Sequence, residues 1–271
     1  MAADSRVLRR RWLILAAGIA LLVATLLLIW RATSQPSDRF WDNILRSGQW
    51  RVAMDPSFPP FEDLGEDGQP VGFDVDLAQE IADRWGVELQ IEGVGFDGLI
   101  DVVWASRVDS VISAVPYQPL FSEDVAFSQP YFEAGLVLVT NLESVNVQSV
   151  DDLAGRSVAV EWGSEGDVQA RALQRRFPDL QIQAKETPAD ALRAVATGTA
   201  QAALVDHVSA LQFQGQGGLV TIAPEVIVSD PYVVVMPRKA PRLQQEIGLV
   251  LEEMAADGTL ERLTDRWFVT R

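Results

Sequence analysis

The chain offers few side chains that can perform covalent or metal chemistry. It has no cysteine and a single histidine, His207, among 271 residues. This excludes disulfides, thiolate metal sites, a thiol nucleophile and an anchor on an acylated cysteine. It also leaves little for a histidine-based metal cluster or a catalytic triad. Carboxylates, hydroxyls and aromatic rings remain, so we expect no enzymatic activity, no metal and no cofactor.

One predicted helix N-terminus has the form of an anion site. Gly163 and Ser164 precede a helical pattern that extends to about Arg176. Free N–H groups and partial positive charge at a helix N-terminus attract carboxylates, and Ser164 is also a good N-cap residue. Glu165 and Asp167 lie in the first turn, where they complement the helix dipole. In a cleft they would disfavour a ligand carboxylate.

Four further residues, Asp55, Phe58, Phe96 and Asp206, stand where predicted strands end or helices begin. Each has a purely structural interpretation. Asp55 and the prolines near Phe58 would stiffen a turn, and Phe96 would pack over the helix that follows it. Asp206 would cap the helix that begins at His207.

Short apolar runs alternate with helical patterns from Trp50 to the C-terminus. Strands are predicted at residues 50–54, 88–92, 110–115, 136–139, 157–160, 180–184, 202–205, 219–222 and 233–236. Helices are predicted at residues 40–48, where Gly48 ends a short helix, at 74–85, with Asp74 as a cap, and at 99–106, 164–176, 188–197, 208–213, 241–256 and 259–268. The alternation predicts α/β layers with mostly parallel sheets, in two units rather than one long sheet.

The N-terminal segment predicts export. The apolar run at residues 12–30 carries no charge and follows four arginines, Arg6, Arg9, Arg10 and Arg11. As a helix, the run would span roughly 28 Å, close to the thickness of a bilayer core, and the arginines keep the N-terminus inside. We predict a basic cytoplasmic segment at 1–11, a transmembrane anchor at 12–30 and a linker at 31–49. A signal peptide cleaved near residues 32–34 is the alternative. Either reading places the body outside the cell or in the periplasm.

The net charge of −16 is distributed unevenly. Residues 1–35 contain five basic and one acidic side chain, a net of +4, which leaves −20 for the remainder. A body of this charge repels nucleic acid and anionic lipid surfaces, so we expect no nucleic-acid partner.

Several stretches together resemble the family 3 extracellular solute-binding proteins of the amino-acid-binding type. They are, in chain order, RVAMDPSFPPFE at 51–62, VGFDVDL at 71–77, FDGLI at 96–100, FSQPYF at 127–132 and ADGTL at 256–260, followed by Trp267 and Phe268. Each motif alone is weak, but their order and spacing match the family from about Trp50 onwards.

The resemblance implies a two-lobed periplasmic-binding-protein fold of type II. Lobe 1 would hold residues 50–138 plus 231–271, and lobe 2 would hold residues 139–230. Two hinge strands near Val139 and Tyr232 would let the lobes close on a small solute. An ABC permease in the membrane would then recognise the closed form of the monomer.

The resemblance also implies ligand contacts. In the family, the matching positions contact the ligand's side chain by charge and ring stacking, bind its amino group near the end of a strand, and hold its ammonium group with a lobe 2 carboxylate. The residues at these positions are Asp55, Phe58, Phe96, Ser113, the backbone of Val115, and Asp206. Ser164 and Glu165 lie at the helix N-terminus that would face the ligand carboxylate.

One departure from the family matters most. The family pattern Ser-x-x-Thr-x-Thr-x-x-Arg aligns without a gap to residues 113–121, and it places Pro116 and Gln118 at the threonines and Phe121 at the carboxylate-binding arginine. Loss of one partner of a buried charge pair costs about 2–5 kcal/mol, so ordinary α-amino acids should bind weakly. Rings, with Phe121 among them, and carboxylates suit an amine-bearing or cationic solute.

The sequence therefore predicts the solute-binding component of an ABC importer. A membrane-tethered sensor or scavenger without a transport role is the alternative. A dehydratase-like enzyme on the same fold is a more remote one.

Overall fold

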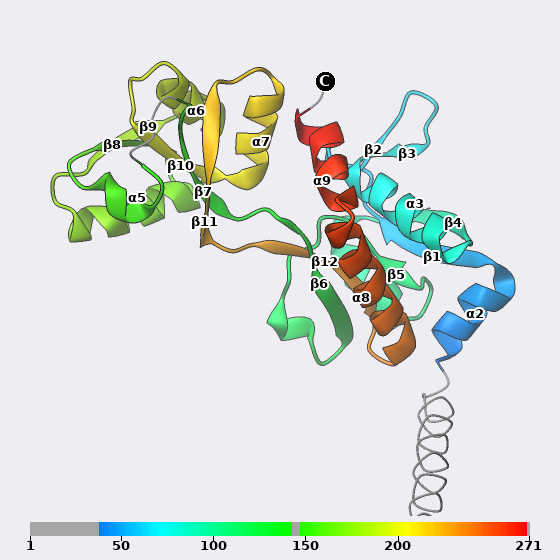
Figure 1. The fold of residues 1–271 in the computed structure, drawn as a ribbon. Coiled ribbons are helices and arrows are strands. Elements are labelled where there is room, and N and C mark those ends of the chain that lie inside the picture. Colours follow the sequence, from blue (N-terminus) through cyan, green and yellow to red (C-terminus); the bar gives the residue numbers. More distant parts are fainter. Residues whose placement is uncertain (1–37, 143–146, 270–271) are drawn as a thin grey trace, which may run out of the picture.

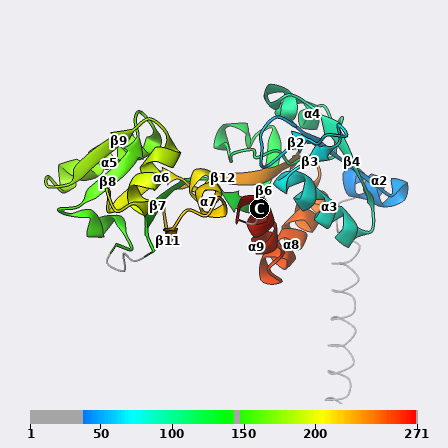
Figure 2. The same cartoon turned by 90° about the horizontal axis from the view of Figure 1, so that it is seen from above.

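The structure, a computed structural model, describes residues 38–142 and 147–269. Two separate five-stranded sheets, each with its own helices, form two bodies that stand side by side (Figure 1). Two extended connections join them, as the view from above also shows (Figure 2). The sequence prediction of a two-lobed α/β fold is thereby confirmed.

Lobe 1 contains the sheet with strand order β4-β1-β5-β12-β6. Its strands are β1 (Gln49–Met54), β4 (Glu88–Gly93), β5 (Ser110–Val111), β6 (Val125–Glu133) and β12 (Pro231–Pro237). β1 pairs in parallel with β4 and β5, whereas β12 is antiparallel to β5 and β6. A small hairpin, β2 (Asp63–Leu64) and β3 (Pro70–Val71), lies beside it.

Helices cover this sheet. They are α2 (Arg39–Ser47), α3 (Phe73–Trp85), α4 (Leu99–Trp104), α8 (Pro241–Ala256) and α9 (Thr259–Thr264), with the π-helical turn η4 (Asp265–Val269) and the 3-10 turns η1 (Phe96–Gly98) and η2 (Pro119–Phe121). Side chains alternate across the strands, so Trp50, Val52 and Met54 enter one apolar cluster and Ala53 enters the other.

Lobe 2 contains the sheet with order β11-β7-β10-β8-β9. Its strands are β7 (Leu136–Asn141), β8 (Ser157–Glu161), β9 (Gln181–Lys185), β10 (Ala202–Asp206) and β11 (Val220–Val228). The helices are α5 (Glu165–Arg176), α6 (Pro188–Ala196) and α7 (His207–Gly215), with the 3-10 turn η3 (Val150–Leu153). β8, β9 and β10 are parallel, and their carboxyl ends lead into the loops that carry the candidate site.

The chain crosses between the lobes at Ala134-Gly135 and at Ser229-Asp230. Residues up to 138 are predicted in lobe 1, but Leu136–Leu138 already pair with β10 in the lobe 2 sheet. An apolar run satisfies either sheet, so its composition did not reveal which sheet it joins. The crossings therefore come earlier than the predicted hinge near Val139 and Tyr232.

Within the predicted linker, residues 31–49, the short helix expected at 40–48 is present as α2, with Gly48 as its C-cap, but it is packed into lobe 1 rather than free in a linker. Trp41 and Ile44 of α2 are buried in the lobe 1 core. The Asp38 carboxylate connects the starts of α2 and α8. Oδ1 accepts from the amides of Phe40 and Trp41, and Oδ2 accepts from two amides at the start of α8. Burial and capping together fold residues 38–48 onto the body.

A second departure concerns Asp74, which was predicted to cap α3. Gly72 occupies the N-cap position, and the Asp74 side chain lies fully buried inside the first turn. The predicted cytoplasmic segment 1–11 and anchor 12–30 lie outside the described residues. Within residues 38–142 and 147–269, no helix has the length and apolar character needed to cross a membrane.

Candidate functional site

A cavity of about 370 Å³ lies where lobe 2 meets the two crossing segments. It brings together three residues singled out from the sequence: Ser164, Glu165 and Asp206. The other lining residues are Ala134, Gly135, Leu136, Glu161, Gly166, Pro188, Leu204, Val205, Val228, Ser229 and Asp230. The cavity is thus built from the ends of β8 and β10, the start of α5 and both connections between the lobes.

The start of α5 is fixed by its own cap. Ser164 Oγ accepts from the Asp167 amide at 3.3 Å and donates to the Glu161 carbonyl at 2.8 Å. Gly166 allows the first turn to lie against β10, since a Cβ atom on Gly166 would stand 2.3 Å from the Leu204 carbonyl oxygen. The Ser164 hydroxyl therefore serves the helix, and the first turn of α5 faces the cavity.

Asp206 combines a structural role with a free oxygen. It ends β10, and Oδ1 accepts from the Ser209 amide at 2.8 Å as the N-cap of α7. Oδ2 accepts no hydrogen bond from the residues that the structure describes. One half of this carboxylate is therefore used by the fold, and the other half remains available to a ligand.

Four carboxylates line the cavity, namely Glu161, Glu165, Asp206 and Asp230, and no lysine or arginine is among the lining residues. The pKa of Asp230 is raised, first by burial and then by the nearby charge of Glu133. Such a set of acceptors without a basic partner attracts positive charge and repels a ligand carboxylate.

The lobe 1 candidates form a second group on the other body. Phe58 and Phe96 are 48% and 47% exposed, so both rings are open to a ligand. Asp55 joins the two ring-bearing loops, because Oδ2 accepts from the Phe96 amide at 2.8 Å and Oδ1 accepts from Ser57 Oγ at 2.7 Å. The Phe58 ring stacks on the buried Phe61 ring, with 5.7 Å between centroids.

Three predicted contacts have structural roles here. Ser113 is fully buried, and Oγ donates to Glu62 Oε1 at 2.6 Å and accepts from the Asp55 amide at 2.9 Å. The Val115 carbonyl accepts from the Val233 amide at 3.0 Å. Phe121 is half-buried against the apolar cluster around Leu99 and Val125. Their contact with a ligand stays a prediction.

The two groups do not share a cavity in this structure. None of the lobe 1 candidates is among the residues that line the lobe 2 cavity, and the bodies that carry the two groups stand apart (Figure 1). A solute would contact both groups only if the lobes approached each other.

Several acidic residues at the lobe 2 cavity and beneath the lobe 1 candidates are not among the site residues predicted from the sequence. Glu161 and Asp230 line the cavity, and Glu62 and Asp74 are buried side by side in lobe 1. Glu62 and Asp74 had a local signal, since both interrupt apolar stretches that were quoted for the family resemblance. Glu161 and Asp230 had none, because only the pairing of distant segments brings them to the cavity.

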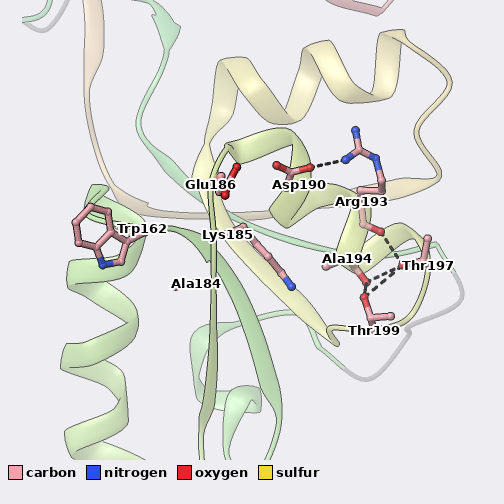
Figure 3. A pocket seen from close by; sticks show the side chains of 9 residues that line it. All are labelled: Trp162, Ala184, Lys185, Glu186, Asp190, Arg193, Ala194, Thr197 and Thr199. Carbon is pink, nitrogen blue, oxygen red and sulfur yellow. Dashed lines mark hydrogen bonds and ion pairs between the residues drawn. The ribbon is translucent and has the colours of Figure 1, made fainter.

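A larger hollow of about 800 Å³ lies elsewhere on lobe 2, beside β9 and α6 (Figure 3). Some of its polar side chains already have partners, since Arg193 pairs with Asp190 and Thr199 Oγ1 donates to the Ala194 carbonyl at 2.9 Å. Trp162 at its rim is 75% exposed. The smaller cavity, where β8, β10 and both lobe connections meet, is the better candidate because open α/β sheets bind ligands at such strand ends.

Comparison with known proteins matches this architecture. The L-cystine-binding protein TcyJ of Escherichia coli K12 is 25% identical over 229 residues, which cover 84% of this chain and 85% of TcyJ. The arginine-binding extracellular protein ArtP of Bacillus subtilis 168 is 27% identical over 226 residues, which cover 82% of this chain and 88% of ArtP. Both relatives are named as binding proteins.

Among solved structures, an ancestral cyclohexadienyl dehydratase has a TM-score of 0.75 at 24% identity, and the match covers 88% of this chain and 99% of that one. This likeness concerns the fold, which therefore also occurs in an enzyme. The model of the bacterial extracellular solute-binding proteins, family 3, matches residues 50–270. Because that match covers both lobes and most of the sequence, the chain belongs to the family 3 bacterial extracellular solute-binding proteins.

Proposed function

We propose that this chain is the solute-binding component of an ABC importer and that its solute is a small organic cation bearing an amine or quaternary ammonium group. The observation that carries the proposal is the lobe 2 cavity, where four carboxylates and no basic side chain meet. An ammonium group there would form charge-assisted hydrogen bonds, which are about twice as strong as neutral ones.

The lobe 1 group complements this cavity. Phe58 and Phe96 present exposed rings, and Asp55 fixes the loops that carry them. A cation held over aromatic rings gains about 0.5–2 kcal/mol. Closure at the crossings, residues 134–135 and 229–230, would bring these rings over a solute already held by Asp206.

The missing arginine argues against ordinary α-amino acids. Phe121 occupies the aligned position and packs into lobe 1. Glu165 adds negative charge at the start of α5, where a ligand carboxylate would otherwise be seated. The relative ArtP is named for arginine, whose side chain is cationic, and this supports the cationic half of the proposal.

We further propose that residues 12–30 remain as a membrane anchor, with the N-terminus in the cytoplasm. The body would be a monomer on the extracellular or periplasmic side. The support is the uncharged apolar run and the arginines before it. Fractionation of cells followed by N-terminal sequencing tests this. A mature chain that begins near residue 35 and partitions into the soluble fraction would show a cleaved signal peptide instead.

Calorimetry with the full chain in detergent tests the choice of solute. The panel contains putrescine, choline, glycine betaine, arginine, glutamine and glutamate. We expect a carboxylate-free amine or quaternary ammonium compound to bind at least about tenfold more tightly than glutamine or glutamate, equivalent to about 1.4 kcal/mol. Tighter binding of glutamate or glutamine than of every amine would overturn the proposal. Native mass spectrometry that finds a co-purified solute without positive charge would do the same.

A further inference from the structure

Lobe 1 buries two acidic side chains, Glu62 and Asp74. Glu62 is 1% exposed and Asp74 is 0% exposed. Neither forms an ion pair with a basic side chain among the described residues. A single buried carboxylate without a cation is already costly, and two adjacent ones are more so.

Donors reach only one oxygen of each carboxyl group. Glu62 Oε1 accepts from Ser113 Oγ at 2.6 Å. Asp74 Oδ2 accepts from the Ala114 amide at 2.5 Å and from the Tyr131 hydroxyl at 3.0 Å. Glu62 Oε2 and Asp74 Oδ1 are buried and have no hydrogen-bond donor within residues 38–142 and 147–269. The two carboxyl groups lie within hydrogen-bonding reach of each other, so one proton between them would satisfy both orphaned oxygens.

We propose that Glu62 and Asp74 share one proton at neutral pH, Glu62 as the acid and Asp74 as the carboxylate, and that this pair positions the lobe 1 half of the solute site. The assignment follows from the donors. Asp74 accepts two hydrogen bonds, which favour its anion, whereas Glu62 accepts one.

The surrounding groups cannot replace the proton. Asp55 lies within electrostatic range of Glu62, and the Tyr131 hydroxyl donates to Asp74. Tyr232 lies within electrostatic range of both members of the pair and of the cavity carboxylates Asp206 and Asp230. All of these groups are acidic or neutral, and none supplies positive charge. In agreement, the pKa of each member is raised, chiefly by burial and, for Glu62, next by the charge of Asp74.

The pair holds the backbone that carries the candidate ligand contacts. Ala114 has φ of 43°, a left-handed conformation that costs free energy for a residue other than glycine. Its amide donates to Asp74 Oδ2, which stabilises this conformation. Glu62 orients Ser113 Oγ, which in turn accepts from the Asp55 amide. Asp55 then holds the Phe96 loop. The acid pair thus acts as a positioning element beneath Asp55 and Phe96. This part of the inference rests on the proposed function, whereas the shared proton does not.

The sign of the pH effect follows from the raised pKa. The folded chain keeps a proton on Glu62 that the unfolded chain releases near the ordinary pKa of 4.5. Stability is therefore full below that pKa and is lost as the pH rises toward the folded pKa. Within this window the folded chain holds one proton more than the unfolded chain. Each rise of one pH unit therefore lowers the folding equilibrium constant about tenfold.

Infrared difference spectroscopy and unfolding titrations of the full chain test the shared proton. In wild type at neutral pH we expect the C=O stretch of a protonated carboxyl group, and we expect Glu62→Gln to remove it while Asp55→Asn retains it. Glu62→Gln, which mimics the protonated acid, should also abolish the alkaline loss of stability. Absence of the band in wild type, or its persistence in Glu62→Gln, would overturn the proposal.

Hydrogen exchange tests the positioning role without any solute. Glu62→Leu should speed exchange of the Asp55 and Ala114 amides at least about tenfold, whereas Glu62→Gln should leave both protected. Equal protection in the two variants would refute the positioning role. If Glu62→Leu does not fold, the spectroscopic result with Glu62→Gln still decides the shared proton. Since neither experiment uses a solute, failure of putrescine or choline to bind would refute the proposed function alone.

Discussion

Gly135 lies directly against the carbonyl oxygen of Val228, and a Cβ atom on Gly135 would stand 2.0 Å from it. Gly135 lies in one connection between the lobes, and Val228 ends β11 directly before the other connection. This contact therefore fixes how closely the connections run beside each other, and it leaves room at that point only for glycine.

Replacement of this glycine should loosen the connection. We expect Gly135→Ala to lower the free energy of unfolding by about 1–3 kcal/mol, because the methyl group forces backbone apart. Gly93→Ala is the matched control, since a Cβ there meets nothing within 4 Å, and its effect should stay below about 0.5 kcal/mol. Denaturant unfolding measures both. Equal effects of the two substitutions would contradict the close contact.

The charge of Asp206 should contribute to solute binding, whereas its Oδ1 atom should contribute to stability as the N-cap of α7. Asp206→Asn retains the N-cap of α7, so the unfolding temperature should change little. Removal of one charged partner should weaken binding of the best amine in the panel by about 2 kcal/mol, or roughly 30-fold. Calorimetry measures this loss, and the exposed Asp179→Asn serves as a control of equal charge change. If Asp179→Asn weakens binding as much, the effect is long-range and Asp206 does not contact the solute.

Glu165 should set the preference between amines and amino acids. The side chain is exposed at the start of α5 and accepts from Gln169 Nε2 at 2.7 Å. We expect Glu165→Gln to weaken amine binding and to strengthen glutamine binding, because the helix N-terminus then faces the ligand without a competing charge. The ratio of the two dissociation constants should shift about tenfold or more. An unchanged ratio would exclude Glu165 from the solute site.

Asp38 should stabilise lobe 1 through two helix starts at once. Its carboxylate is buried and caps α2 with one oxygen and α8 with the other. Asp38→Ala should therefore cost about 2 kcal/mol or more of unfolding free energy, the sum of two caps. The exposed Asp42→Ala in the same helix should cost less than about 1 kcal/mol. A cost for Asp38→Ala no larger than that of the control would show that α2 is not a part of the folded body.

The sequence by itself determined most elements of the body and the family, but it did not predict β6 (Val125–Glu133) or the small hairpin of β2 and β3. The strand Trp50–Met54 and the helix ending at Gly86 are present as predicted, because apolar spacing and a glycine stop are local properties. The absence of cysteine and the presence of Phe121 at the arginine position are likewise properties of the sequence alone. Our predictions of a non-enzymatic protein and of weak binding of ordinary amino acids rest on these two properties.

Only the tertiary structure decided where the lobes divide and which acids meet. Leu136–Leu138 are apolar and fit either sheet, so pairing with β10 alone assigns them to lobe 2. Glu161, Asp206 and Asp230 come from three separate segments, and Glu62 meets Asp74 across the start of α3. Hydrophobic periodicity reports which face of an element is buried, but it carries no information on which distant element covers that face. The electrostatic character of the site therefore emerges only when the strands pair.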